Sequence, residues 1–311
     1  MNKKNIISLL VLMALVAVFF IIKSNEKVEK RFDFFGVDSV ELKGIEIYSD
    51  SDTIKLKKEA DNWMITYPIY YKPQDRKIKN IYDKVITVET STNPVAETEE
   101  SQETYNVKDS LGYRIKLKGK NNKTLKEAYI GKSKVNYSYS YGRYKGDNKI
   151  YQLKENLYYS LNPKLSSWRN RKVLEIKESQ IDKIHVAYSK NSFTLTATDS
   201  LWLYSDSNNE FAIKRDNKTL NKIKTGLRNL STSKFIDNKY EEYSKLFKDP
   251  ILEIMVTTID GNKQHIAVVK KDENFILKKN DNKENLFKIT SSWVNRFSKS
   301  PGHFENEENT D

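Results

Sequence analysis

The feature that most constrains the fold of this chain is a hydrophobic pattern that occurs twice, with a constant offset between the two copies. Five apolar positions of the first copy have apolar counterparts 139 positions later in the chain: Ile45, Ile47, Ile54, Leu56 and Trp63 correspond to Ile184, Val186, Phe193, Leu195 and Trp202. Five equal offsets that include one tryptophan in each copy indicate a tandem repeat. A period this long, present in two copies, is unlike a solenoid and predicts two similar folding units.

Within each copy, the spacing of the apolar residues predicts short strands and then a helix. Alternation around Ile45 and Ile54, on either side of turn residues 50–52, is typical of an antiparallel meander. Apolar residues at intervals of three and four then form one helical stripe per copy: Ile78, Ile81, Val85 and Val88, followed later by Leu220, Ile223, Leu227 and Leu230. The offset between the two stripes is larger by three than the offset between the strands, so the second copy has a short insertion after its tryptophan strand.

These elements predict an α+β fold of two tandem duplicated units. Each unit is expected to contain an antiparallel meander, an amphipathic helix and further antiparallel strands, such as those around Ile115 and Ile254, and the units follow an N-terminal transmembrane helix. The predicted boundaries are 1–31 for a membrane anchor with its connector, 45–163 for the first unit, 164–180 for a junction, 181–298 for the second unit and 299–311 for a disordered acidic tail.

The N-terminal segment predicts where the rest of the chain lies. Ile6–Ile22 is an apolar run, interrupted only by Ser8, and its length is at the short end of what spans a bilayer as a helix. Lys3 and Lys4 precede the run and no small-residue cleavage site follows it, which favours an uncleaved signal-anchor over a removed signal peptide. Flanking charge does not fix the orientation, but large domains translocate largely regardless of charge. We therefore expect a single-pass protein of the cell membrane with an extracytoplasmic body, on the periplasmic or cell-surface side.

Composition excludes several classes of function. The chain has no cysteine and three histidines, so disulfides, thiolate metal sites and cysteine nucleophiles are impossible, and a multi-histidine metal centre is disfavoured. The net charge of +12 comes from lysines spread along the chain rather than gathered in a stripe, and an exported body would not meet nucleic acid. His185 and His265 have no catalytic partner at a recognisable spacing. We expect no catalytic residue, no metal, no cofactor and no nucleic-acid partner.

The first candidate binding surface is a row of tyrosines. Tyr137, Tyr139 and Tyr141 alternate with serines, which predicts three rings on one face of a strand. Arg143 and Tyr144 follow directly and extend the candidate surface. Such a face can stack on sugar rings or anchor a protein partner. The alternative is a cross-strand aromatic ladder with a structural role.

A second candidate lies at the predicted junction between the units. Trp168, Arg169 and Arg171 combine an indole ring with two guanidinium groups, and a guanidinium can bind an anionic group bidentately. The alternative is a linker element packed between the units.

The order and spacing of several motifs resemble the DUF4340 domain, a bacterial domain of unknown function, over most of 45–300. The residues that carry the resemblance are the strand-turn-strand of Ile54–Ile65 with Trp63, Pro68, Asp75, Tyr105 with Asp109, Ile130–Lys132 and Ile150–Leu153. Some members of this family are fused to, or associated with, auxiliary components of an ABC transport system linked to gliding motility. The resemblance implies an envelope protein that partners a membrane complex, and it implies no catalytic residues.

The leading expectation is a membrane-anchored accessory or interaction protein of a cell-envelope complex, such as an ABC-type transport or gliding-related system. The alternative is a carbohydrate- or polymer-binding module that uses residues 137–144. Besides the bilayer around Ile6–Ile22 and a membrane-protein partner, anionic lipid or glycan is a candidate ligand, because basic residues such as Lys23 and Lys27 follow the apolar run.

Overall fold

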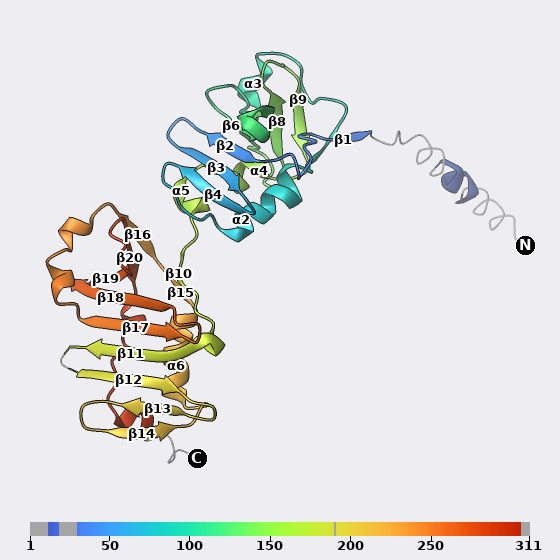
Figure 1. Ribbon diagram of the computed structural model, residues 1–311. Coiled ribbons are helices and arrows are strands. Elements are labelled where there is room, and N and C mark those ends of the chain that lie inside the picture. Colours follow the sequence, from blue (N-terminus) through green and yellow to red (C-terminus); the bar gives the residue numbers. More distant parts are fainter. Residues whose placement is uncertain (1–11, 19–29, 190, 306–311) are drawn as a thin grey trace, which may run out of the picture. The chain divides into compact units, whose positions relative to one another are not determined.

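The computed structural model describes residues 12–18, 30–189 and 191–305, and it divides the chain between Asn170 and Arg171 into two compact units (Figure 1). The division falls within the segment 164–180 that the sequence predicts as a junction. Both units are built mainly from antiparallel strands with a few helices, so the mixed α+β character predicted from the sequence is confirmed.

Unit 1 begins at the edge strand β1 and ends after a pair of one-turn helices. Its elements are β1 (Arg31–Asp33), β2 (Gly44–Tyr48), β3 (Thr53–Glu59), β4 (Asn62–Tyr67), α2 (Asp75–Asn80), η1 (Ile81–Val85), β5 (Glu89–Ser91), α3 (Ser101–Thr104), β6 (Tyr113–Lys118), η2 (Lys120–Asn122), β7 (Thr124–Lys132), β8 (Ser140–Tyr144), β9 (Ile150–Leu153), α4 (Leu157–Ser160) and α5 (Leu165–Trp168). Because β1 pairs with β5 and the following Phe34 and Phe35 are fully buried, the folded unit starts before Ile45, the predicted boundary.

Unit 2 contains a similar series of elements. They are β10 (Lys172–Leu174), η3 (Glu178–Gln180), β11 (Ile181–Tyr188), β12 (Asn191–Ala197), β13 (Trp202–Ser205), β14 (Glu210–Ile213), α6 (Lys218–Arg228), β15 (Leu230–Ser231), β16 (Lys234–Asp237), η4 (Tyr240–Glu242), η5 (Leu246–Lys248), β17 (Leu252–Thr258), β18 (Lys263–Lys271), β19 (Asn274–Lys279), β20 (Asn285–Ile289), α7 (Ser291–Val294) and α8 (Gly302–Glu305). The strands β10 and β15 form a separate small ribbon.

The two large sheets share one strand order over eight strands. In unit 1 the described strands are ordered β1-β5-β9-β8-β7-β6-β2-β3-β4. In unit 2, read from the opposite edge, the order is β16-β20-β19-β18-β17-β11-β12-β13-β14. If β1 and β14 are set aside, each strand of one sheet has a counterpart at the same place in the other.

The strand registers also agree. Ile45 lies opposite Leu56 on β3 and opposite Leu117 on β6. In unit 2, the residue 139 positions after Ile45 is Ile184, which lies opposite Leu195 on β12 and opposite Val256 on β17. These partners are again 139 positions after those of unit 1, so the sequence offset is also an offset in the pairing of backbones.

Each unit has its own hydrophobic core between one face of the sheet and the helix that follows the meander. The alternating residues of the meander point into this core, as the sequence predicts. Trp63 and Trp202 are both buried, and the indole of Trp63 donates a hydrogen bond of 3.0 Å to the Tyr82 hydroxyl on η1. Trp63 thus ties the meander of unit 1 to its helix, and Trp202 belongs to the core cluster of unit 2.

The predicted helices are shorter than their apolar stripes. In unit 1 the α-helix α2 continues into the π-helical turn η1, which ends at Val85, and the buried Val88 lies outside the helix. In unit 2, α6 ends at Arg228, and Leu230 is the first residue of β15. In both units the last apolar residue of the stripe reaches the core from the segment after the helix.

The short insertion of unit 2 accompanies an additional strand. After β13 the chain turns back as β14, which pairs with β13 and forms the edge of the sheet. At the corresponding place in unit 1, Tyr71 makes only an isolated bridge to Ile65. The apolar pattern around Phe211 and Ile213 therefore belongs to an edge strand rather than to a loop.

The segment 299–311, predicted as a disordered acidic tail, is folded over its first part. Residues 302–305 form α8, and Phe304 is buried against Phe193 and Tyr204, whose ring centroids lie 5.6 and 5.1 Å away. Burial of this one aromatic side chain in the core is enough to fold the segment, although the residues around it are polar. The remainder of the predicted tail, 306–311, lies outside the described residues.

Most of the predicted anchor also lies outside the described residues. Residues 12–18 form a helix whose side chains are exposed. Within the described ranges, no helix combines the length and the apolar character needed to cross a bilayer.

Candidate functional site

The three tyrosines predicted on one strand face do not share a strand. Tyr141 lies in β8, whereas Tyr137 lies in a turn and Tyr139 precedes the strand. The reason is local hydrogen bonding: the Ser133 hydroxyl accepts from the backbone N–H of Asn136, and the Asn136 side chain accepts from the N–H of Ser138. Serine and asparagine side chains that bond nearby backbone in this way favour turns over sheet pairing.

Tyr139 and Tyr141 form part of an internal aromatic contact. The Tyr141 ring lies 4.6 Å from that of Tyr105 and 5.5 Å from that of Tyr139. Burial, together with the hydrogen bond to Tyr139, raises the pKa of Tyr141 to about 12. Tyr141 thus helps to hold the segment around α3 against the outer face of the sheet, and of the three tyrosines only Tyr137, 67% exposed, is largely open to solvent.

Arg143 has a structural position. Its side chain is 3% exposed, donates to the carbonyl oxygens of Val107 and Asp147 at 3.0 Å each, and pairs with Asp109. Burial alone would raise the pKa of Asp109, but hydrogen bonds from Tyr129 and Arg143 outweigh it and hold that pKa below its usual value. A guanidinium with these partners ties a loop to the sheet and is not available for a ligand.

Tyr144 is also part of the packing of unit 1. Its ring stacks on Phe34 with centroids 4.4 Å apart, and its hydroxyl donates to the Phe34 carbonyl oxygen. Of the candidate residues within 137–144, Tyr137 is therefore the most exposed.

The second candidate group is divided between the two units. Trp168 and Arg169 close unit 1 and are 0% and 1% exposed; the indole donates to the Asn162 carbonyl oxygen at 2.7 Å, and the Arg169 guanidinium lies 4.2 Å from the centre of the Tyr71 ring. Arg171 opens unit 2 and donates to the carbonyl oxygens of Thr232 and Ser233. Burial of Trp168 and Arg169 leaves them no surface for an external anion.

The structure instead gathers tyrosines from distant parts of unit 1 around Tyr137. The Tyr113 and Tyr158 rings stack with centroids 4.1 Å apart, and Tyr159 lies 5.7 Å from Tyr158 and 6.2 Å from Tyr137. The Lys132 ammonium lies over two of these rings, 5.9 Å from Tyr137 and 5.5 Å from Tyr159. Burial raises the pKa of Tyr113, and a hydrogen bond with Tyr159 raises the pKa of Lys132, so Lys132 stays charged.

Two adjacent hollows follow these rings, and we call them together the tyrosine groove. One hollow, of about 310 Å³, is lined by Asn106, Leu111, Lys132, Lys134, Tyr137 and Tyr158. The other, of about 230 Å³, is lined by Ser49, Asp50, Ser51, Asp52, Leu111, Gly112, Tyr113, Tyr158, Asn162, Pro163 and Lys164. Aromatic faces beside ammonium groups and amide or hydroxyl groups can bind a sugar ring or an extended peptide. Sequence spacing could not reveal the groove, since its parts are far apart along the chain and Tyr137 is the one lining residue that the sequence singled out as a binding candidate.

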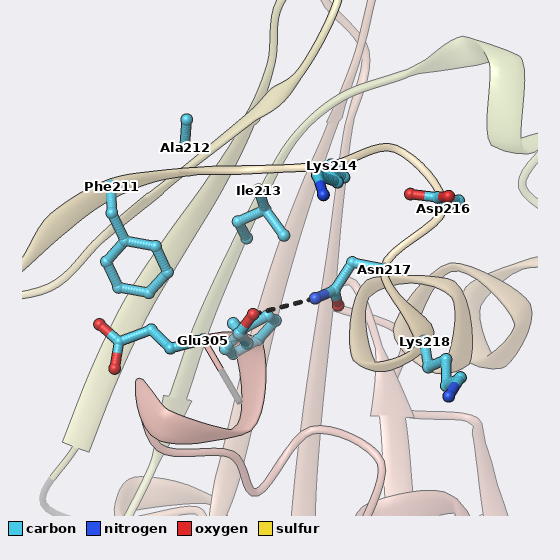
Figure 2. A pocket seen from close by; sticks show the side chains of 9 residues that line it. Phe211, Ala212, Ile213, Lys214, Asp216, Asn217, Lys218 and Glu305 are labelled. Carbon is cyan, nitrogen blue, oxygen red and sulfur yellow. Dashed lines mark hydrogen bonds between the residues drawn. The ribbon is translucent and has the colours of Figure 1, made fainter. Parts of the chain in front are cut away.

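Unit 2 has a different pocket, of about 480 Å³, between β14, the start of α6 and α8 (Figure 2). The Asn217 side chain projects toward α8: its amide donates to the Phe304 carbonyl oxygen at 3.0 Å, and its oxygen accepts from the N–H of Leu220 at 2.9 Å. Asn217 therefore both caps α6 and ties it to α8. The amide nitrogen and oxygen of Asn217 both form hydrogen bonds within unit 2.

The two histidines considered from the sequence each have one polar neighbour in unit 2. His185 Nδ1 lies 3.0 Å from the Thr194 hydroxyl, and His265 Nε2 lies 3.3 Å from a Glu253 carboxylate oxygen. Both histidines lie on the face of the unit 2 sheet that is turned away from its main hydrophobic core. Among the residues described by the structure, no three histidine, aspartate or glutamate side chains lie together as a metal site would require.

The fold and the groove define a two-unit α+β protein with an aromatic groove in unit 1. Residues 63–249 match the family model described as "Domain of unknown function (DUF4340)", which is more than half of the chain, and the chain belongs to this family. The match runs from β4 of unit 1 to the segment before β17 of unit 2. No curated protein and no solved structure matches the chain.

Proposed function

We propose that the chain is a membrane-anchored, extracytoplasmic accessory protein of a cell-envelope complex. The observation that carries the proposal is the apolar run Ile6–Ile22, whose residues 12–18 are helical with exposed side chains. Exposure of consecutive residues that are all apolar suits a lipid environment rather than a protein core. The class of complex that the family resemblance implies is an ABC-type transport or gliding-related system.

We further propose that the two units arose by duplication. The shared strand order, the shared register and the constant sequence offset support this origin. Duplication of an envelope module supplies two surfaces that can diverge while the framework is kept.

The tyrosine groove is the surface that we assign to partner recognition. Tyrosine rings offer large contact area at low cost in side-chain entropy, and the groove has the mixture of apolar and polar groups that protein interfaces use. The same chemistry favours a second candidate function, binding of an envelope carbohydrate or other polymer, because sugar rings stack on tyrosine faces.

One experiment separates these functions. In the full-length protein, Tyr137 is replaced by the photoreactive residue benzoylphenylalanine, and intact cells are illuminated. We expect this residue to cross-link to an integral membrane protein, which mass spectrometry then identifies. Tyr70 is a matched control position, because it is 64% exposed and its hydroxyl donates to Glu59, at the end of β3 opposite to the turn 49–52 that lines the groove. An adduct with carbohydrate would support the second function. Identical adducts from both positions, or none, would remove the groove as the recognition surface.

A further inference from the structure

Part of the sheet in unit 1 exposes a cluster of cations that we call the basic face. It consists of the outward-pointing residues Lys55 and Lys57 on β3 and Arg114, Lys116 and Lys118 on β6. The strand β2 runs between them and contributes Tyr48, whose ring centre lies 5.9 Å from the Lys55 ammonium, 5.8 Å from the Arg114 guanidinium and 5.9 Å from the Lys116 ammonium. The ring helps to hold these three cations in place without neutralising them.

The fold does not require these cations. Because the strands of the two units correspond in order and register, each position of the basic face has an equivalent in unit 2, displaced by the same constant offset. The equivalents of Lys55 and Lys57 are Thr194 and Thr196 on β12. Those of the three β6 residues are Glu253, Met255 and Thr257 on β17. All five cations of unit 1 are therefore replaced by neutral or acidic residues where the same framework occurs again.

The basic face keeps an excess of positive charge after its carboxylates are counted. Glu127 on β7 lies within 4 Å of Arg114, Lys116 and Lys145, and Glu46 on β2 accepts a hydrogen bond from the Tyr48 hydroxyl. Burial would raise the pKa of Glu127, but these cations lower it below its usual value, so it remains ionised. With Glu59, which follows Lys55 and Lys57 on the same side of β3, three carboxylates stand against six cations, namely the five of the basic face and Lys145, and Lys57 is exposed to solvent.

Aromatic residues at this face suit the boundary between lipid and water. The ring of Tyr67, 49% exposed, lies 5.9 Å from the Lys55 ammonium, so that Lys55 is placed between Tyr48 and Tyr67. Tyrosine is enriched at the level of lipid headgroups, where its ring is partly buried and its hydroxyl remains hydrated. Lysines beside such rings add attraction to an anionic surface.

We propose that the basic face docks on the anionic headgroups of the membrane in which the chain is anchored. This inference rests on the anchor of the proposed function. The chain from Ile22, the last residue of the apolar run, to Lys30, the first described residue of unit 1, extends at most about 28 Å. From β1 to β2 there are six steps between neighbouring strands, about 29 Å across the sheet. A unit tethered so closely can lay this part of the sheet on the bilayer, and the tether keeps its local concentration there high.

The test uses full-length protein in lipid nanodiscs and one environment-sensitive fluorophore. Because the chain has no cysteine, a fluorophore on Thr53→Cys, beside the basic face on β3, is a unique label. Its emission should shift to the blue in discs of equal parts phosphatidylglycerol and phosphatidylcholine but not in phosphatidylcholine alone, and high salt should reverse the shift. The equivalent label on Ser192→Cys of unit 2 should not respond.

A matched pair of triple variants tests which lysines are responsible. The first variant installs the unit 2 residues through Lys55→Thr, Lys57→Thr and Lys118→Thr. It should lower the equilibrium constant for docking on the anionic bilayer about a hundredfold. Lys183→Thr, Lys234→Thr and Lys263→Thr remove the same charge from exposed strand positions of unit 2 and should leave docking unchanged.

The possible failures can be told apart. A protein that does not co-elute with the discs contradicts the anchor and with it the proposed function. A protein that inserts but whose Thr53→Cys label ignores phosphatidylglycerol overturns the docking proposal alone. A label that responds to soluble polyphosphate in neutral discs, and not to phosphatidylglycerol, assigns the basic face to a soluble polyanion and also overturns membrane docking.

Discussion

Replacement of Trp202 by alanine should lower the free energy of unfolding of unit 2 by about 3–5 kcal/mol, and Trp63→Ala should have a similar effect on unit 1. Each side chain is less than a tenth exposed and fills the space between the meander and the rest of its core. Truncation leaves a cavity that the surrounding strands cannot fill without losing their register. Hydrogen exchange read by mass spectrometry measures the two units separately in one full-length sample.

The control for this prediction is Trp63→Phe. This substitution keeps an aromatic ring but removes the N–H group that donates to Tyr82. We expect it to lower the free energy of unfolding of unit 1 by much less than Trp63→Ala does. Increased exchange should be confined to the unit that carries the substitution, because each core cluster contains residues of one unit. Equal loss of protection in both units after a single substitution would contradict independent cores.

Arg143→Ala should destabilise unit 1 by about 3 kcal/mol, because it removes the partner of two carbonyl oxygens in a buried position. It should also release the loop that contains Val107 and Asp109 from the sheet, since Arg143 donates to both. Limited proteolysis within residues 95–112 should accelerate in the variant. A fully stable, protease-resistant Arg143→Ala protein would return Arg143 to the list of residues free to bind a ligand.

Lys278→Ala is the matched control in unit 2. Lys278 lies at the corresponding place on β19 and contacts the rings of Tyr240 and Phe247 at 5.6 and 5.3 Å, but its side chain is only half-buried. Its loss removes cation–π contacts and leaves no carbonyl of the kind that Arg143 satisfies, so the effect should be about 1 kcal/mol or less.

The framework of each unit could be predicted from the sequence because it depends on patterns with a short period. Alternation of apolar residues places Ile45 and Ile184 in the core, and the constant offset predicts equivalent pairing, which the registers follow. The helices were harder to delimit, since Val88 and Leu230 fit a helical stripe yet reach the core from outside the helix. An apolar period indicates which residues are buried more reliably than it indicates where a helix ends.

The binding surfaces could not be predicted in the same way. A turn made by Ser133 and Asn136 breaks the alternation on which the tyrosine row depended. Arg143 and Trp168 have the residue types of a binding site, but long-range packing buries them. The tyrosine groove joins tyrosines from separate strands and loops. The basic face joins β3 and β6, which are far apart in sequence, and the comparison of the two units shows that the framework occurs without its cations.

The central claim, an anchored protein with an extracytoplasmic body, is tested most directly by the side of the membrane on which a unique thiol is exposed. Asn208→Cys lies in the exposed turn before β14, and Asn2→Cys lies before the apolar run. In spheroplasts, a membrane-impermeant maleimide should label Asn208→Cys at once and Asn2→Cys only after lysis. Labelling of Asn2→Cys in intact spheroplasts with protection of Asn208→Cys would show the opposite topology and contradict the account.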